Sequence, residues 1–361
     1  MVRGLMKLPE NRVRRNYKGG AGIDRMHGRS DCRDNNMPEE WVGSMVEAFN
    51  PGMEPVEQEG LAVVETEDGP RFLRNLVDAD REYYLGSSIH RDGSWQLSFL
   101  LKILDSAMRL HVQAHPTTQF ANEVMGKPYG KLECYYILHV REGVEPYIRL
   151  GFQHMPGRES WREIVENQDK ARMDACFEKI PVHVGEVWYI PGGMPHAIGE
   201  GITMLEIMEP SDLVVRCEFE REGIVVPEDG RFMGRGLDFC LDIFDYTEYS
   251  KEDIIKKCRI QPQMIEKTDT CTRMRLVDEK LTNCFFVEKL SVTGAAVLQH
   301  NHRFTLGVVC AGSCRIEAGG ETIRLKTGDG FVIAAGIEEY RVVSEAEAEL
   351  VTVYPGRDME S

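Results

Sequence analysis

The chain has 361 residues, of which 42% are apolar and 8% aromatic, and it carries a net charge of −16. This length allows two ordinary domains with buried cores, and the composition is that of a globular protein rather than a disordered or fibrous one. The acidic excess argues against nucleic acid as a partner, because phosphate backbones need a dominant basic face. A small anionic ligand is still allowed, because it needs only a local cationic pocket.

The N-terminal residues 1–20 are basic but hold no apolar run of signal-peptide length. No stretch elsewhere approaches the ~20 apolar residues that a membrane helix needs. We therefore expect a cytoplasmic protein with no membrane partner. The ten cysteines include no CxxC pair, which in this compartment indicates reduced and mostly buried thiols rather than disulfides.

Residues 1–80 are rich in Gly, Pro, Asn and Asp, which predicts irregular structure with a few strands. The apolar run at 95–116 fits either a helix or a buried strand in its first half, because periodicity alone does not separate the two. Strands are expected to dominate residues 131–220. In KLECYYILHV, Glu133 and Tyr135 share one face of a predicted strand.

Residues 213–220, LVVRCEFE, also alternate and predict a strand. Helical spacing of apolar residues predicts one helix over 159–180, and Ser250 with Asp253 predicts the capped start of another. Short strands separated by Gly turns fill residues 283–354, which is typical of a sandwich or barrel. The fold class is therefore mainly β with a few helices.

A segment crowded with glycine and proline, GEVWYIPGGMPHAIGEG, holds a single imidazole, His196. Its spacing of Gly185, Pro191, Gly193 and His196 resembles the second signature of the cupin β-barrels. A turn that breaks the strand at Pro191 re-aims the side chains after it, and a barrel mouth is where ligand sites form. The segment alone fits a plain hairpin as well as a metal ligand.

Partners for His196 occur earlier in the chain. Gln113 and His115 lie two residues apart and so on one face of a strand, and Glu133 opens the next strand. Two imidazoles, one carboxylate and one amide form a plausible zinc shell that leaves a position open for water or substrate, as in a catalytic site. His111 lies two residues before Gln113 and so on the same face of the strand, which makes it an alternative ligand of the metal.

Together these motifs resemble those of the type I mannose-6-phosphate isomerases, which read QVHP, GKTEC, PxGxxHA and a Glu followed by an Arg. The matching segments here are QAHP at 113–116, GKLEC at 130–134, PGGMPHAI at 191–198, Glu206, and PSD at 210–212 with Arg216. The resemblance covers about residues 95–220. The segment around Trp41 resembles the GExW segment of the family more loosely.

The resemblance implies two cupin-type (RmlC-like jelly-roll) β-barrels and one zinc ion per chain. The implied zinc ligands are Gln113, His115, Glu133 and His196. Arg216 matches the catalytic arginine of the family, and Lys131 and Glu206 match residues that line its sugar pocket. The implied reaction interconverts mannose 6-phosphate and fructose 6-phosphate through a cis-enediol, and the implied partner is a small sugar phosphate, bound by a monomer or homodimer.

The residue types suit this chemistry. Bound zinc polarises sugar oxygens and stabilises an enediolate. Arg216 is permanently charged and suits either that oxyanion or the phosphate. Glu206 lies in an apolar strand, where desolvation would raise its pKa and make it a base.

Two departures from the family pattern lie beside the expected metal. His111 stands where the family has serine, and Thr117 stands where it usually has aspartate. These differences keep open an isomerase of another sugar or sugar phosphate. A non-catalytic sugar-binding cupin is the alternative from another class, and Lys131, Glu206 and Arg216 argue against it, because a binding module needs neither a base nor an arginine around an open metal.

The expected domains are a catalytic barrel with its N-terminal region (1–225), a helical connecting segment (226–275) and a second cupin-like barrel (276–361) without a full metal site. In the second barrel Glu339 occupies the position of the motif histidine. We therefore expect His300 and His302 to be structural.

Overall fold

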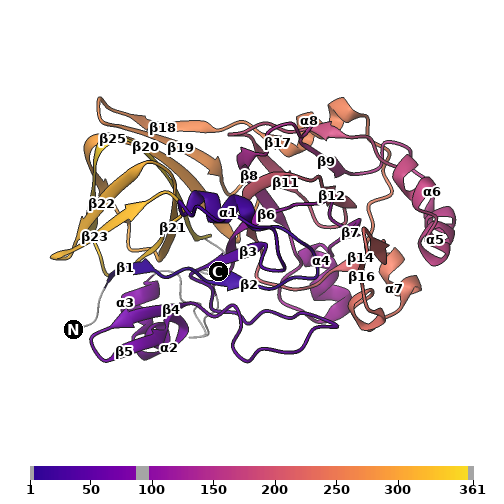
Figure 1. Ribbon diagram of the computed structural model, residues 1–361, viewed down its shortest axis with the longest axis horizontal. Coiled ribbons are helices and arrows are strands. Elements are labelled where there is room, and N and C mark those ends of the chain that lie inside the picture. Colours follow the sequence, from indigo (N-terminus) through magenta and orange to yellow (C-terminus); the bar gives the residue numbers. More distant parts are fainter. Residues whose placement is uncertain (1–3, 87–96, 357–361) are drawn as a thin grey trace.

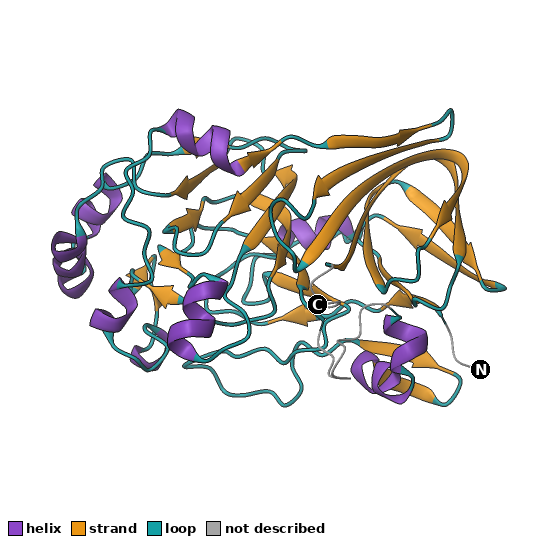
Figure 2. Ribbon diagram, turned by 180° about the vertical axis from the view of Figure 1, so that it is seen from behind, coloured by secondary structure: helices purple, strands orange, loops and turns teal. Residues whose placement is uncertain are grey.

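The computed structural model describes residues 4–86 and 97–356. Its strands gather in two regions that lie next to each other along the longest axis (Figure 1). Seen from behind, the helices lie mainly at the left end and along the lower edge of the molecule (Figure 2). The prediction of a mainly β fold is confirmed.

The first region is formed by two antiparallel sheets. In strand order, the seven-stranded sheet consists of β17 (Arg259–Ile260), β11 (Val187–Ile190), β8 (Glu133–Val140), β13 (Ile202–Met208), β6 (Leu100–Asp105), β3 (Glu39–Val42) and β2 (Arg12–Val13). The five-stranded sheet consists of β10 (Ile180–Pro181), β9 (Tyr147–Leu150), β12 (His196–Ile198), β7 (Gln113–Ala114) and β14 (Val215–Arg216).

The inner faces of these two sheets pack against each other. Trp188 and Ile137 from the larger sheet form one apolar cluster with Leu150 and Ile198 from the smaller one. The alternation predicted for β8 is present, because Tyr135 and Ile137 belong to this cluster whereas Tyr136 belongs to a different one. Glu133, at the start of β8, has the same parity as Tyr135 and Ile137 and therefore lies on the same inner face.

The second region is a nine-stranded antiparallel sheet. Its strands are β1 (Leu5–Leu8), β24 (Gly330–Ile333), β21 (Thr305–Ala311), β25 (Glu339–Pro355), β20 (Phe285–Gln299), β19 (Cys271–Val277), β18 (Gln263–Lys267), β22 (Ser313–Ala318) and β23 (Glu321–Lys326). The outer face of the first region packs on this sheet, since Ile103 and Leu205 share an apolar cluster with Phe285 and Val353.

Smaller elements cover the edges. Two short hairpins are formed by β4 (Val63–Thr66) with β5 (Gly69–Phe72), and by β15 (Glu220–Arg221) with β16 (Ile224–Val225). The helices are α1 (Ala21–Met26), α2 (Leu73–Ala79), α3 (Arg81–Leu85), α4 (Thr118–Phe120), π-helix η1 (Ala121–Met125), α5 (Arg158–Asn167), α6 (Lys170–Ala175), 3-10 helix η2 (Glu228–Gly230), α7 (Leu237–Leu241) and α8 (Lys251–Cys258).

Several local expectations meet the structure here. The run at 95–116 forms the strand β6, although its first two residues lie outside the described part. The single helix expected over 159–180 is divided into α5 and α6, because Gln168 takes a left-handed conformation with φ of 50°. The capping box predicted from Ser250 and Asp253 is present at α8.

The strand expected over 213–220 extends only across Val215–Arg216. Just beyond it, the fully buried Glu218 accepts hydrogen bonds from Arg109 and from the backbone of Val112. The charge of Glu218 is thus satisfied inside the protein by one side chain and one backbone N–H. All ten cysteines are free thiols and most are buried.

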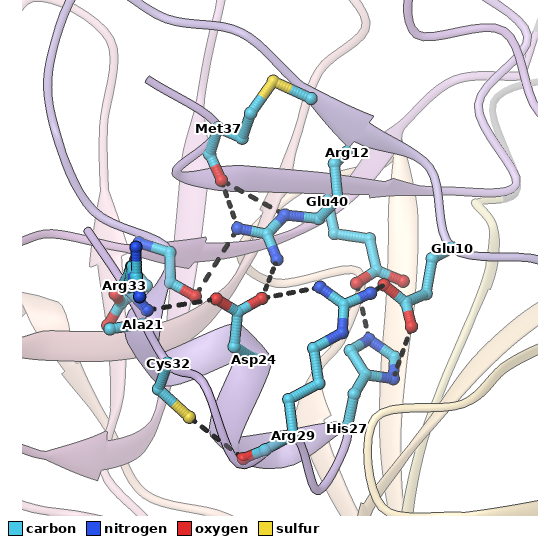
Figure 3. Close-up of polar contacts among 12 residues, drawn as sticks. Glu10, Arg12, Ala21, Asp24, His27, Arg29, Cys32, Arg33, Met37 and Glu40 are labelled. Carbon is cyan, nitrogen blue, oxygen red and sulfur yellow. Dashed lines mark hydrogen bonds and ion pairs between the residues drawn. The ribbon is translucent and has the colours of Figure 1, made fainter. Parts of the chain in front are cut away.

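The N-terminal segment joins both regions. Its strand β1 pairs with β24, and the α1 segment is held by a polar network in which Arg12 and Arg29 each donate to Asp24 Oδ1 at 2.8 Å (Figure 3). Lys326 donates to the carbonyl of His27 at 3.0 Å and so ties α1 to the second region.

The division of the chain into three domains, with boundaries at residues 225 and 275, stays a prediction. No helix in the described ranges is long and apolar enough to cross a membrane.

Candidate metal centre and substrate pocket

Three strand ends bring the expected metal ligands together. His115 follows β7 directly, Glu133 begins β8 and His196 begins β12. His196 and Gln113 are direct partners in the ladder between β12 and β7. The turn before His196 places Gly193 at φ of 85°, a conformation suited to glycine, and the Gly193 N–H donates to the carbonyl of His115 at 2.6 Å.

The ligand atoms converge on one point. His115 Nε2 lies 3.1 Å from Glu133 Oε1, and His196 Nε2 lies 3.5 Å from Glu133 Oε2. Gln113 Nε2 lies 3.3 Å from His196 Nε2. His115, Glu133 and His196 are 1%, 0% and 2% exposed. The sequence therefore predicted the members of a buried cluster that is able to hold a metal ion.

The hydrogen bonds of the two imidazoles orient them as ligands. His115 Nδ1 donates to the carbonyl of Leu213 at 2.8 Å, and His196 Nδ1 donates to that of Met194 at 3.0 Å. Each Nε2 therefore presents its lone pair to the cluster, which is the arrangement that backbone partners give to metal-binding histidines.

The charges in and around the cluster suit a metal ion. Burial and the charge of Lys131 lower the pKa of His115 to about 3, so the ring is neutral. Burial acts to raise the pKa of Glu133, but Lys131, His115 and His196 together outweigh it and hold the pKa well below its usual range. His115 Nε2 and Glu133 Oε1 are buried and have no hydrogen-bond partner. Two facing lone pairs of this kind fit a bound metal ion.

The amide of Gln113 completes the set. Its nitrogen faces His196, and turning the amide would place the oxygen toward the cluster without changing the shape of the side chain. Nitrogen and oxygen donors from His, Glu and Gln are of the types that zinc accepts.

A cavity opens beside these ligands, and the predicted catalytic residues line it. The lining includes Gln113, Lys131, Glu206 and Arg216. Lys131 Nζ lies 3.1 Å from Glu133 Oε1. Arg216 is the ladder partner of Gln113, so both side chains leave neighbouring strands on the same side. The structure thus places the three predicted catalytic residues in one pocket with Gln113, one of the predicted metal ligands.

Glu206 is the buried carboxyl of this pocket. Its Oε2 accepts from Lys102 Nζ at 3.0 Å. Burial raises the pKa of Glu206 to about 7, even though the charge of Lys102 opposes this effect. A carboxyl with such a pKa exchanges a proton near neutral pH, as a general base requires.

Sequence reasoning missed the residues that surround Glu206. Lys102 also lies 3.7 Å from Glu39, and Glu39 accepts hydrogen bonds from Tyr17 at 2.7 Å and from Trp41 at 2.7 Å. Lys102 was visible as a lone charge in the apolar strand LLKILD, and Trp41 belonged to a loosely matching segment. No sequence signal pointed to Tyr17.

His111 and Thr117, the two departures from the family pattern, lie in different surroundings. His111 lines the pocket, but its Nε2 donates to the carbonyl of Ile224 at 3.2 Å, and it is not part of the ligand cluster. The Thr117 side chain accepts from the Phe120 N–H and caps α4. His111 is therefore a pocket residue, whereas Thr117 has a local structural role.

A second cluster of possible ligands, Glu10, His27 and Glu40, lies outside this pocket (Figure 3). Arg29 already pairs with Glu10, and His27 Nε2 lies 2.7 Å from Glu40. Burial acts to lower the pKa of His27, but Glu40 outweighs it and the net shift is upward. The cluster is therefore an ion-pair network rather than a metal site.

In the second region His300 is a core residue. Its Nδ1 donates to the carbonyl of Ile337 at 2.9 Å, and its Nε2 lies 2.9 Å from Thr305 Oγ1. Both ring nitrogens are thus occupied, as expected for a structural histidine.

Comparison with curated proteins decides the family. The chain is 30% identical over 249 residues to the mannose-6-phosphate isomerase of Streptococcus mutans, an alignment that covers 69% of this chain and 72% of that protein. The chain belongs to the mannose-6-phosphate isomerase family. It is also 27% identical over 251 residues to mannose-6-phosphate isomerase ManA of Bacillus subtilis, covering 69% and 72% of the two chains.

Two further comparisons agree with this family. The family model for the mannose-6-phosphate isomerase cupin domain matches residues 279–355. The crystal structure of the Bacillus subtilis mannose 6-phosphate isomerase superposes with a TM-score of 0.72 at 20% identity, over 97% of this chain and 99% of that one. A zinc-bound mannose 6-phosphate isomerase superposes with a TM-score of 0.71 at 14% identity, over 98% and 100%. The cupin-type architecture expected for the chain is thus confirmed.

Proposed function

We propose that this member of the mannose-6-phosphate isomerase family is a zinc-dependent aldose–ketose isomerase that interconverts mannose 6-phosphate and fructose 6-phosphate. The observation that carries the proposal is that a buried cluster of possible metal ligands adjoins a pocket lined by a carboxyl of raised pKa. Neutral His115 and His196 face the carboxylate of Glu133, and next to them Glu206 has a pKa of about 7. One environment suits a metal and the other suits a proton transfer.

Gln113, His115, Glu133 and His196 would hold one zinc ion per chain. When bound, zinc supplies a Lewis acid that polarises the sugar carbonyl and stabilises the negative charge of the enediolate. Lys131 stands beside Glu133 and adds positive charge at the same place. Arg216, the ladder partner of Gln113, brings a further permanent charge to the pocket.

Glu206 would move the proton between C2 and C1 of the opened sugar. Lys102 fixes its carboxylate through one hydrogen bond, and the apolar strand around it keeps bulk water away. A base of this kind removes the C2 proton while O1 gains a proton, which gives the cis-enediol, and it then delivers a proton to C1 while the O2 hydroxyl loses its own. The other groups that face Glu206 hold it in position rather than compete for the proton.

A second candidate is the same reaction on another sugar or sugar phosphate. His111 favours it, because this side chain lines the pocket where the family has serine. With Nε2–H donated to Ile224, Nδ1 is an acceptor, which suits a sugar hydroxyl. A cytoplasmic location and a monomeric or homodimeric assembly stay predictions.

The experiment that separates these candidates follows the zinc-loaded protein by NMR with several aldose 6-phosphates offered one at a time. The proposal expects fructose 6-phosphate to appear from mannose 6-phosphate, and with solvent deuterium at the transferred position. Turnover of a different aldose phosphate only would favour the second candidate. Absence of turnover with all of them would refute both.

A further inference from the structure

The carboxyl of Glu133, a predicted metal ligand, has two oxygens in unlike surroundings. Its Oε1 lies 3.1 Å from His115 Nε2, is buried and has no hydrogen-bond partner among the described residues. Lys131 Nζ is 3.1 Å from the same oxygen but is not aligned as a hydrogen-bond donor. In contrast, Oε2 accepts a hydrogen bond from the hydroxyl of Tyr135. One oxygen is thus occupied, and the other is left open toward an imidazole.

The ring of Tyr135 is fixed by the sheet around it. Tyr135 comes two residues after Glu133 on β8, so both side chains lie on the inner face. It stands directly opposite Trp188 on β11 and opposite Glu206 on β13. The side chain is 1% exposed and belongs to the apolar cluster that joins the two sheets of the first region. Close packing on this scale leaves a buried ring little freedom, so its hydroxyl is held in one place.

The hydroxyl of Tyr135 has two carboxyls nearby but only one proton to donate. Glu206 is its ladder partner, yet the hydrogen bond is made to Glu133. Glu206 receives its hydrogen bond from Lys102 Nζ at 3.0 Å instead. The predicted ligand and the predicted base therefore have separate donors, and a change at Tyr135 should act on the ligand.

We propose that Tyr135 is a positioning residue of the metal centre, whose hydroxyl occupies Oε2 of Glu133 and leaves Oε1 available to the metal ion. The inference rests on the proposed function and adds to it a residue that is not among those lining the substrate cavity. Without this donor the buried carboxyl loses the bond that fixes its orientation. Partners that hydrogen-bond a ligating carboxylate contribute about 10- to 100-fold to metal affinity.

The neighbouring tyrosine provides a matched control. Tyr136 follows Tyr135 on β8, points to the opposite face and is 4% exposed. Its hydroxyl also donates to a carboxylate, Glu349 Oε1, at 2.7 Å. Glu349 keeps an ion pair with Lys289 and is not part of the metal-ligand cluster. Tyr136→Phe therefore removes the same kind of hydrogen bond from the same strand without affecting a predicted ligand.

The experiment measures the zinc affinity of the metal-free chain by competition with a chromophoric chelator, with no sugar present. Tyr135→Phe should weaken zinc binding by about 10- to 100-fold, whereas Tyr136→Phe should bind zinc as tightly as the wild type. With zinc in excess, kcat of Tyr135→Phe should fall less than its zinc affinity, because Glu206 keeps its hydrogen bond from Lys102. Equal losses of zinc affinity in both variants would overturn the inference, because they would show a general loosening of β8.

A second measurement carries the test if Tyr135→Phe does not fold. Tyr135 or Tyr136 is replaced, one at a time, by a ring-fluorinated tyrosine, which keeps the hydroxyl, and zinc binding is followed by fluorine NMR. The signal from position 135 should move when one equivalent of zinc is added, and the signal from position 136 should not. A signal at position 135 that zinc leaves unchanged would overturn the inference.

The outcomes separate this inference from the proposed function. Wild-type zinc affinity in Tyr135→Phe would overturn the role of Tyr135 and leave the isomerase proposal standing. A wild type that binds zinc with the help of Tyr135 but converts no sugar phosphate would refute the isomerase proposal and leave this role standing. A wild type that binds no zinc would overturn both.

Discussion

Replacing Lys102 with methionine tests the electrostatics of the pocket. The ammonium lies 3.0 Å from Glu206 and 3.7 Å from Glu39, and the Lys102 side chain is 5% exposed. Methionine keeps most of the volume but leaves two buried carboxylates without this cation. Removing one partner of a buried ion pair costs about 3–5 kcal/mol of unfolding free energy.

The pH dependence of this cost follows from Glu206. Burial raises its pKa to about 7 in the folded protein, against about 4.3 in an unfolded chain. Because the folded state binds the extra proton, stability falls by about 1.4 kcal/mol per pH unit until the folded pKa is passed. In the wild type this decline ends near pH 7. Without Lys102 the pKa of Glu206 rises further, so the decline continues to higher pH.

The assay is urea unfolding of the metal-free protein near pH 7 and near pH 8.5. The gap between wild type and Lys102→Met should widen by up to about 1.4 kcal/mol per pH unit above 7. Lys170→Met is the control, because Lys170 pairs with Glu220 at the surface and its loss should change stability by less than about 0.5 kcal/mol. A gap that is independent of pH, or as small as the control's, would refute this account of the pocket.

Two further predictions concern the metal and the base. His196→Ala should lose zinc, measured per chain by elemental analysis, whereas His302→Asn should keep one zinc and full activity; zinc retained by His196→Ala would contradict the ligand set. Glu206→Gln should keep zinc but lose about 10²-fold or more in kcat. In the wild type, kcat/KM should rise with pH through a pKa at or below about 7, because a bound cation favours the ionised carboxyl; a flat pH profile would contradict the role of Glu206 as the base.

Strand parity and turn chemistry are local, so the sequence could single out His115, Glu133 and His196, which the structure brings together in one buried cluster. Alternation placed Glu133 on the inner face of β8, and the glycine turn aimed His196 at the same point. The mainly β class followed from the same short-range pattern.

The ion-pair network around Glu206 could not be predicted from local sequence patterns. It depends on the pairing of β3 with β6, which sets Trp41 opposite Lys102 across 61 positions of the chain (102 minus 41). Arg15 and Tyr17 reach the pocket from a segment without regular structure. Contacts between distant residues also accompany two other differences from the sequence prediction. Where the expected helix over 159–180 is divided, Gln168 donates to the carbonyl of Cys217. Just after the short strand β14, Glu218 accepts from Arg109.

The most direct test of the central claim is turnover of mannose 6-phosphate by the purified protein before chelation, after chelation, and after zinc is added back. The account predicts that fructose 6-phosphate forms, that chelation abolishes its formation, and that one equivalent of zinc per chain restores it. Full turnover by protein shown to be free of metal would contradict the account.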